Sequence, residues 1–164
     1  AIRWVHAHAQ AYHLDTSRFY LIGMSAGGHM VSLAATLGQG RFACRGGWED
    51  QPCEFTAAIS SSGAYDLPKL SWGSGWLPTG EPWDEARSYA SPIEHGAADS
   101  RPLLILHSDD DGSVPIDQAT RMAAALENAG ARHRFLHYTD RGHMLITDEV
   151  VAESQAFIAD LEGA

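Results

Sequence analysis

The sequence has few basic side chains and no long apolar run, and each absence excludes a class of protein. Lys and Arg number 11 against 21 for Asp and Glu, which gives a formal net charge of −10 at pH 7. An acidic surface of this kind repels phosphate backbones, so we expect no nucleic-acid partner. A membrane-spanning helix needs about 18 consecutive apolar residues. No stretch approaches that length, so we expect no membrane span.

Cysteine is equally scarce, with only Cys44 and Cys53 in the chain. A disulfide between them would close a short surface loop and indicate an oxidising compartment, whereas two unpaired thiols would suit the cytoplasm. Two cysteines do not decide between these alternatives, so the compartment stays open. There is no Cys-x-x-Cys or His-Glu-x-x-His spacing, and we expect no structural metal.

The sequence does contain enough apolar residues for one folded domain. Of its 164 residues, 45% are hydrophobic, which suits a single core over residues 1–164. Apolar residues at helical spacing predict helices, and short continuous apolar runs predict buried strands. The predicted helices cover residues 1–12, 29–37, 116–129 and 148–161, and the predicted strands cover residues 19–22, 55–61, 103–107 and 132–138. This alternation predicts an α/β fold: a mostly parallel sheet with helices on both faces.

A serine flanked by glycines lies between the first predicted strand and the next helix. Residues 23–27 read Gly-Met-Ser-Ala-Gly, which fits the pattern G-x-S-x-G. A nucleophilic serine must project from a sharp turn, and we expect side chains at positions 23 and 27 to collide with backbone. The turn places Ser25 at a helix N-terminus, where the Ala26 amide can donate to a developing oxyanion. The alternative is an idle serine in an ordinary glycine-rich turn.

A serine nucleophile needs a base and an orienting acid, and the sequence offers both in a suitable order. Residues 107–115 follow the strongest predicted strand and include three consecutive aspartates. His143 follows the strand predicted at residues 132–138. Because parallel strands end at one edge of the sheet, Ser25, an aspartate and His143 should meet there, in the chain order Ser, Asp, His.

Five segments, taken together, resemble the α/β-hydrolase superfamily across nearly the whole chain. They are Gly-Met-Ser-Ala-Gly-Gly-His at 23–29, Tyr-Asp-Leu at 65–67, Ala-Ser-Pro at 90–92, the run at 107–115 and Gly-His at 142–143. Within the superfamily they are similar to feruloyl-esterase-like and acetyl-xylan-esterase-like carboxylesterases. Kynurenine formamidase and prolyl-oligopeptidase-type hydrolases are relatives of these enzymes.

The resemblance implies which aspartate serves the histidine. The family's loop reads His-Gly-x-x-Asp-x-x-Val-Pro, and alignment on His107 and the Val-Pro pair makes Asp111 the triad acid. Ser108 then stands where Gly is usual. Asp109 and Asp110 are the rivals, and we interpret both as solvated loop carboxylates.

The resemblance also implies an activity. Ser25 would be the nucleophile, His143 the base and Asp111 its partner, with no cofactor and no metal. The substrate would be a small or medium carboxylic ester, such as an acyl sugar or a phenolic acid ester. A formamidase or peptidase could use the same triad. A non-catalytic fragment that completes its sheet with another chain is the alternative outside enzymes.

One departure from the family pattern concerns the oxyanion loop. The family carries a His-Gly-Gly run after an earlier strand, and this chain has no counterpart. We therefore expect the chain to be the C-terminal portion of a longer hydrolase. The sheet edge near residues 19–22 should then be unpaired and open to association.

The remaining candidates have structural interpretations. We expect Asp66 to cap the turn after its strand and His29 to pack at its helix start. Residues 68–92 read as a lid-like or acyl-pocket insertion, with a plain surface cluster of aromatics as the alternative. Its tryptophans are Trp72, Trp76 and Trp83. The other histidines, for which we expect structural roles, are His6, His8, His13, His107 and His137.

Overall fold

The computed structural model, which describes residues 1–38, 46–72 and 83–163, contains one four-stranded parallel sheet. Its strands run in the order β1-β2-β3-β4. The bounds are β1 Tyr20–Met24, β2 Ala57–Ser61, β3 Leu103–Ser108 and β4 His133–Tyr138. All three neighbouring pairs are parallel, so all four strands end at the same edge of the sheet. The predicted α/β fold is confirmed.

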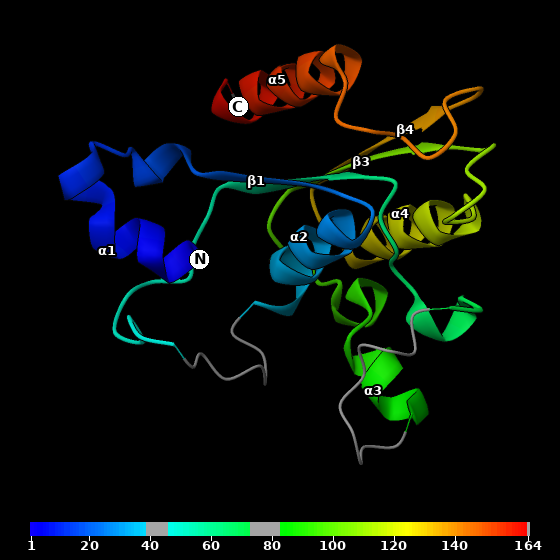
Figure 1. Cartoon of the computed structure of the whole chain (residues 1–164), viewed down its shortest axis with the longest axis horizontal. Coiled ribbons are helices and arrows are strands. Elements are labelled where there is room, and N and C mark those ends of the chain that lie inside the picture. The colour runs from blue at the N-terminus through cyan, green and yellow to red at the C-terminus, as the bar shows by residue number, and fades with distance from the viewer. Residues whose placement is uncertain (39–45, 73–82, 164) are drawn as a thin grey trace.

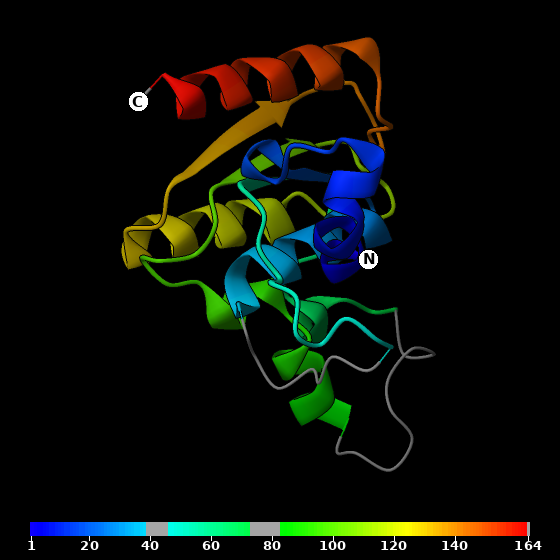
Figure 2. The same cartoon turned by 90° about the vertical axis from the view of Figure 1, so that its left-hand side faces the viewer.

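Helices cover both faces of this sheet, as Figures 1 and 2 show. On one face lie α2 (Ala26–Leu37) and α4 (Asp117–Ala129), and on the other lies α5 (Asp148–Glu162). The remaining helices, α1 (Ile2–Tyr12) and α3 (Trp83–Tyr89), lie outside these layers. Three short 3-10 turns complete the described chain: η1 Thr16–Arg18, η2 Leu67–Lys69 and η4 Pro92–His95.

Two apolar clusters, one on each side of the sheet, form the core. The α2 and α4 side buries alternate strand residues such as Ala58, Leu103 and Ile105. The α5 side buries the intervening residues, among them Ile59 and Leu104. Successive side chains of a strand point to opposite faces, so a continuous apolar run is what a sheet covered on both sides requires.

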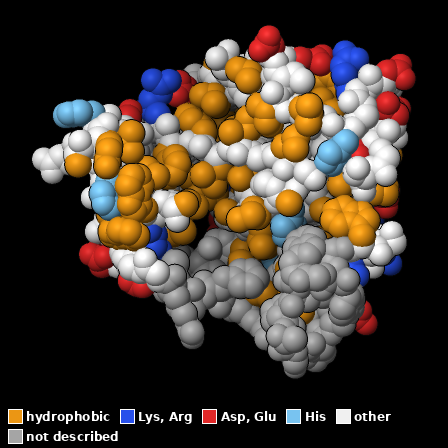
Figure 3. Space-filling model, viewed as in Figure 1, with side chains coloured by type: hydrophobic (Ala, Val, Ile, Leu, Met, Phe, Trp, Pro, Cys, Tyr) orange, Lys and Arg blue, Asp and Glu red, His pale blue; other side chains and the backbone are white. Residues whose placement is uncertain are grey.

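The first strand differs from its prediction in position and in burial. It extends to Met24, because Gly23 and Met24 pair in register with Ser60 and Ser61 of β2. The predicted burial on both faces is wrong for Ile22, whose exposed fraction is 48%. This strand is at the edge of the described sheet, and hydrophobic side chains are exposed on the face shown in Figure 3.

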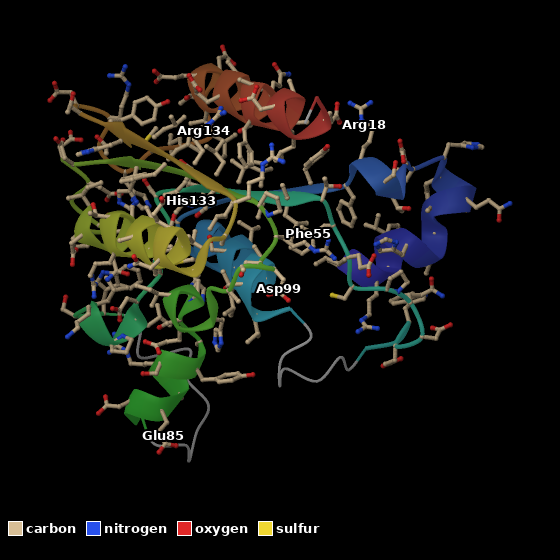
Figure 4. All side chains as sticks on the ribbon, turned by 180° about the vertical axis from the view of Figure 1, so that it is seen from behind. Arg18, Phe55, Glu85, Asp99, His133 and Arg134 are labelled. Carbon is tan, nitrogen blue, oxygen red and sulfur yellow. The ribbon has the colours of Figure 1, made fainter. Side chains whose placement is uncertain are left out.

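Helix ends and ion pairs fix where the helices sit. Thr147 caps α5 through its side chain, which accepts from the Val150 amide. Arg18 pairs with Glu162 at 2.8 Å, so η1 is tied to the C-terminal end of α5 (Figure 4). Arg134 of β4 pairs with Asp160 of the same helix.

Several predicted features fall partly outside the described residues. Trp76 and Cys44 lie outside them, whereas Cys53 is a free, half-buried cysteine. Trp72 is 41% exposed, and its Nε1 donates to the carbonyl oxygen of Ser113 at 3.0 Å. The prediction missed α3, which lies in the tryptophan-rich segment. Across the described ranges, no helix has the length and apolar character needed to cross a membrane.

Candidate active site

Ser25 occupies a strained turn between β1 and α2. Its backbone angles are φ 54° and ψ −117°, a conformation that residues with a Cβ rarely adopt. The Ser25 amide donates to the carbonyl oxygen of Ser61 at 2.9 Å, and the Ser25 carbonyl accepts from the His29 amide at 2.9 Å. Ala26 is the first helical residue, and the first amides of a helix have no acceptor within it.

The glycines around Ser25 match their prediction at position 23 but not at position 27. A Cβ at Gly23 would lie 2.2 Å from the carbonyl oxygen of Gly27, so the predicted collision at position 23 is confirmed. The predicted collision at Gly27 is wrong, because a Cβ there meets nothing within 4 Å. The close approach occurs at Gly28, where a Cβ would lie 2.8 Å from Ser60 Oγ and 3.0 Å from Gly63 Cα. The helix turns Gly28 toward β2 and leaves Gly27 facing away.

Asp111 and His143 form a hydrogen-bonded pair. His143 Nδ1 lies 3.0 Å from Oδ1 and 2.8 Å from Oδ2 of Asp111. The Asp111 side chain is fully buried, and that of His143 is 26% exposed. A carboxylate only accepts, so Nδ1–H of His143 is the donor and Nε2 keeps its lone pair in the neutral ring.

Backbone amides fix the Asp111 carboxylate from the other side. Oδ1 accepts from the amides of Ser113 and Val114, both at 2.9 Å. Burial by itself raises the pKa of Asp111, but the bonds from Val114, His143, Ser113 and the Ser62 hydroxyl together hold it below its ordinary value. The residue is therefore an anionic partner for His143 at neutral pH.

Two serines at the end of β2 hold the backbone just after His143. Ser62 Oγ accepts from the Met144 amide at 2.9 Å, and Ser61 Oγ donates to the Met144 carbonyl oxygen at 3.1 Å. Ser62 is fully buried and has φ 48°. This contact was not predicted from the sequence. The available signal was a run of three serines at the carboxyl end of a central strand.

The rival aspartates have distinct surroundings. The nearest ionic partner of Asp109 is His137, at 3.8 Å. Asp110 is not simply solvated as predicted, because it accepts from the amides of Arg141 and Gly142 at 3.2 and 2.8 Å.

Asp66 also departs from its predicted role. It occupies the N-cap position of η2 without a side-chain capping bond. Its carboxylate instead pairs with Arg121 of α4. The backbone amides of Tyr65 and Asp66 donate instead to the buried side-chain oxygen of Gln118, at 3.0 and 2.8 Å.

The other histidines make contacts that suit structural roles. Buried His29 donates from Nδ1 to the Ala64 carbonyl oxygen at 2.9 Å, as the packing interpretation requires. His107 Nε2 donates to the Val114 carbonyl oxygen at 2.8 Å. Burial lowers the pKa of both rings, which favours their neutral forms. His6 bonds to the Glu54 carbonyl oxygen at 2.8 Å, and His13 ends α1 with φ 55°.

One large hollow in the described structure lies away from Ser25. Its volume is about 530 Å³, and it opens at the C-terminal end of α2, with Thr36, Asp99 and Arg101 in its wall. Ser25 is at the opposite end of that helix. Among the described residues, no three His, Cys, Asp or Glu side chains are grouped as a metal site requires.

Known proteins match this chain over most of its length. The sequence profile of the Prolyl oligopeptidase family matches residues 1–161. A probable carboxylic ester hydrolase, LipM, of Mycobacterium tuberculosis is 36% identical over 131 residues, 73% of this chain and 30% of LipM. The esterase LipQ of the same organism is 31% identical over 80% of this chain and 33% of its own length. Dipeptidyl-peptidase 5 of Aspergillus fumigatus is 25% identical over 89% of this chain and 20% of its own length.

Solved structures share the fold. A truncated carbohydrate esterase from gut microbiota superposes with a TM-score of 0.86 at 23% identity, covering 99% of this chain and 66% of the esterase. A thermophilic esterase from Thermogutta terrifontis gives a TM-score of 0.79 at 21% identity, over 98% and 62% of the two chains. The chain thus spans about a third of the two mycobacterial relatives and under two thirds of the second structure.

Proposed function

This chain belongs to the prolyl oligopeptidase family, and on that premise we propose that it carries the catalytic triad of a serine esterase. Ser25 is the nucleophile, His143 the general base and acid, and Asp111 the group that orients the histidine. The preferred substrate is a small or medium carboxylic ester, such as an acyl sugar or a phenolic acid ester. The chemistry needs neither a metal nor a cofactor.

The proposed reaction has two halves. Ser25 Oγ attacks the ester carbonyl carbon while His143 Nε2 takes the hydroxyl proton. The negative charge that forms on the carbonyl oxygen is stabilised by the Ala26 amide. The C–O bond then breaks, the alcohol leaves with the proton from His143, and an acyl group stays on Ser25. Water attacks this acyl-enzyme with His143 again as base, which releases the acid and restores Ser25.

The observation that supports this proposal most strongly is the bond between His143 and Asp111. The two residues come from separate loops, after β4 and after β3, and their contact leaves His143 Nε2 as a free base. Ser25 follows β1 at the same edge of the sheet. A strained serine backbone in a sharp turn at this edge is the geometry that a nucleophile requires.

Ester hydrolysis can be tested against its nearest rivals with three substrate types. We expect the complete protein to cleave p-nitrophenyl acetate faster than N-formylkynurenine or peptide amides. A fluorophosphonate probe should label wild type at Ser25 and leave Ser25→Ala unlabelled. Rapid ester cleavage by Ser25→Ala would contradict the proposal.

Peptide hydrolysis is the second candidate, because dipeptidyl-peptidase 5 is also similar to this chain. We favour esters because the two ester hydrolases are 36% and 31% identical and the peptidase 25%. Faster cleavage of peptide amides than of esters would reverse this preference. If the chain is a non-catalytic fragment, the fluorophosphonate probe should not label it at all.

A second oxyanion donor completes the proposed site. The proposed first donor is the Ala26 amide, and tetrahedral intermediates are normally held by two donors. Because the chain spans only about a third of its two mycobacterial relatives, we propose that the second donor comes from a part of a longer protein that this chain does not include. Without it, the 164-residue chain should turn over about a hundred- to thousand-fold more slowly than the complete protein.

A further inference from the structure

Two side chains at the carboxyl end of β3 form hydrogen bonds with the loop that carries His143. Asp110 Oδ1 accepts from the amides of Gly142 at 2.8 Å and Arg141 at 3.2 Å. The Ser108 hydroxyl donates to the same carboxylate oxygen and accepts from the Arg141 amide at 3.1 Å. We refer to Ser108 and Asp110 together as the loop clamp.

The loop needs such support because its backbone is strained. Asp140 and Gly142, on either side of Arg141, both have φ 57°. A residue with a Cβ in this region costs of order 1–3 kcal/mol and persists only where its surroundings enforce it. The clamp bonds the two amides immediately after Asp140, so it stabilises the turn just before His143.

The three adjacent aspartates therefore have different tasks. Asp111 bonds the ring of His143. Asp110 bonds the backbone of the two preceding residues. Asp109 contacts neither, since its nearest ionic partner is His137 at 3.8 Å.

We propose that Ser108 and Asp110 are positioning residues that hold His143 in reach of both Asp111 and Ser25. This inference rests on the proposed function and extends it to two side chains that touch no reacting atom. The hydrogen bonds from the Ser108 hydroxyl and the Gly142 amide lower the pKa of Asp110, which keeps the clamp anionic at neutral pH. Bonds to a charged acceptor are roughly twice as strong as neutral ones.

The clamp also explains a departure from the family pattern. Ser108 stands where the resemblance predicts Gly, and a glycine has no hydroxyl with which to join Asp110 to Arg141. Ser108 and Asp110 therefore work as a pair in this chain. Ser61 and Ser62 hold the downstream side of His143 through Met144, and the clamp holds the backbone on the upstream side, where the Arg141 side chain also pairs with Glu149 at 3.0 Å.

The test compares neighbouring aspartates in the complete protein. Asp110→Ala removes the acceptor, Asp110→Asn keeps a neutral one, and Asp109→Ala is the matched control. We expect kcat for p-nitrophenyl acetate to fall about ten- to a hundred-fold in Asp110→Ala with little change in KM, since misplaced catalytic groups cost rates of this order. Asp110→Asn should be intermediate and Asp109→Ala equal to wild type.

A second readout does not require activity. The proton between His143 Nδ1 and Asp111 should give a far-downfield proton NMR signal, identified by its loss in His143→Gln. We expect the signal to weaken or disappear in Asp110→Ala and to persist in Asp109→Ala. Ser108→Gly, which installs the family's usual residue, should weaken it while the protein stays folded by circular dichroism.

The outcomes separate this inference from the proposed function. If Asp110→Ala keeps both the wild-type kcat and the NMR signal, the clamp has no positioning role. An equal loss in Asp109→Ala would also overturn it, because that residue does not touch the loop. If Asp110→Ala fails to fold, Ser108→Gly and Asp110→Asn decide by the same two readouts. If Ser25→Ala retains full esterase activity, the proposed function fails, and the NMR comparison still tests the clamp.

Discussion

The amide of Ser25 donates a 2.9 Å hydrogen bond to the carbonyl oxygen of Ser61, the last residue of β2. The neighbouring strand therefore supports the serine in a backbone conformation that it would not adopt alone. The Ser61 side chain bonds Met144, the residue after His143. One residue of β2 thus contacts both the segment that carries the proposed nucleophile and the segment that carries the proposed base.

The strain at Ser25 gives a stability prediction. Glycine adopts positive φ without the Cβ penalty, so Ser25→Gly should be more stable than Ser25→Ala by about 1–3 kcal/mol. Thermal unfolding of the two variants measures the difference. Equal melting temperatures would mean that the turn is unstrained in solution.

Replacement of the serine also tests the chemistry. Because triad members act as a unit, Ser25→Ala should lower kcat by several orders of magnitude while the fold stays intact. Thr120→Ala is the control, because it removes an exposed hydroxyl on α4 that donates to the carbonyl oxygen of Ile116, one turn earlier in the chain. Initial rates with p-nitrophenyl acetate, measured beside circular dichroism, separate loss of chemistry from loss of fold.

The bonds to Asp111 predict how stability depends on pH. They hold its folded-state pKa below the ordinary value of 3.8, so the carboxylate stabilises the fold above about pH 3.8. That stabilisation is lost as the pH falls through the lower folded-state pKa. Asp111→Asn should therefore be less stable than wild type at pH 7, and the difference should shrink in acid.

Activity should distinguish the same aspartate from its neighbours. Asp111→Asn should reduce kcat far more than Asp109→Asn, because only Asp111 fixes the His143 tautomer. Steady-state rates of the two variants provide the comparison. If Asp109→Asn were the damaging change, the assignment of Asp111 as the acid would be wrong.

The two glycines after Ala26 should differ sharply in tolerance. Gly28→Ala places a Cβ 2.8 Å from Ser60 Oγ and 3.0 Å from backbone of β2 and the loop after it, so we expect a loss of about 1–3 kcal/mol from overpacking. Gly27→Ala, whose Cβ meets nothing within 4 Å, should be neutral or stabilising because alanine favours the helix. Urea unfolding of both variants tests the contrast.

We expect the 164-residue chain, produced alone, to self-associate through the edge strand β1. In the described sheet β1 pairs with β2 on one side only, and Ile22 is 48% exposed. An apolar edge of this kind pairs with other chains. Ile22→Lys should shift the chain toward monomer in sedimentation velocity at micromolar concentration. Identical sedimentation of variant and parent chain would exclude this edge as the contact.

The alternation of helices and strands could be read from the sequence because each element carries its own local signal. The apolar residues 57–59 of β2 and 103–106 of β3 form short runs, and both strands are fully buried. Thr147 and Gly130 mark helix ends through local chemistry alone, an N-cap side chain and a left-handed residue. The burial of β1 could not be read in the same way, because exposure of Ile22 depends on which neighbours flank the strand.

For the candidate site, too, some features follow from the sequence and others only from the tertiary structure. The sequence alone determined which residues have the chemistry and which strand ends carry them: a serine between glycines, an aspartate run and a histidine after later strands. Composition does not distinguish the three adjacent aspartates. The family resemblance implied Asp111, and the tertiary structure shows that its carboxylate is the one that bonds His143. The tertiary structure also decided that Gly28, not Gly27, makes the close approach, and that Ser62 and Asp110 hold the backbone around His143. These contacts join residues far apart in the chain, so no local pattern encodes them.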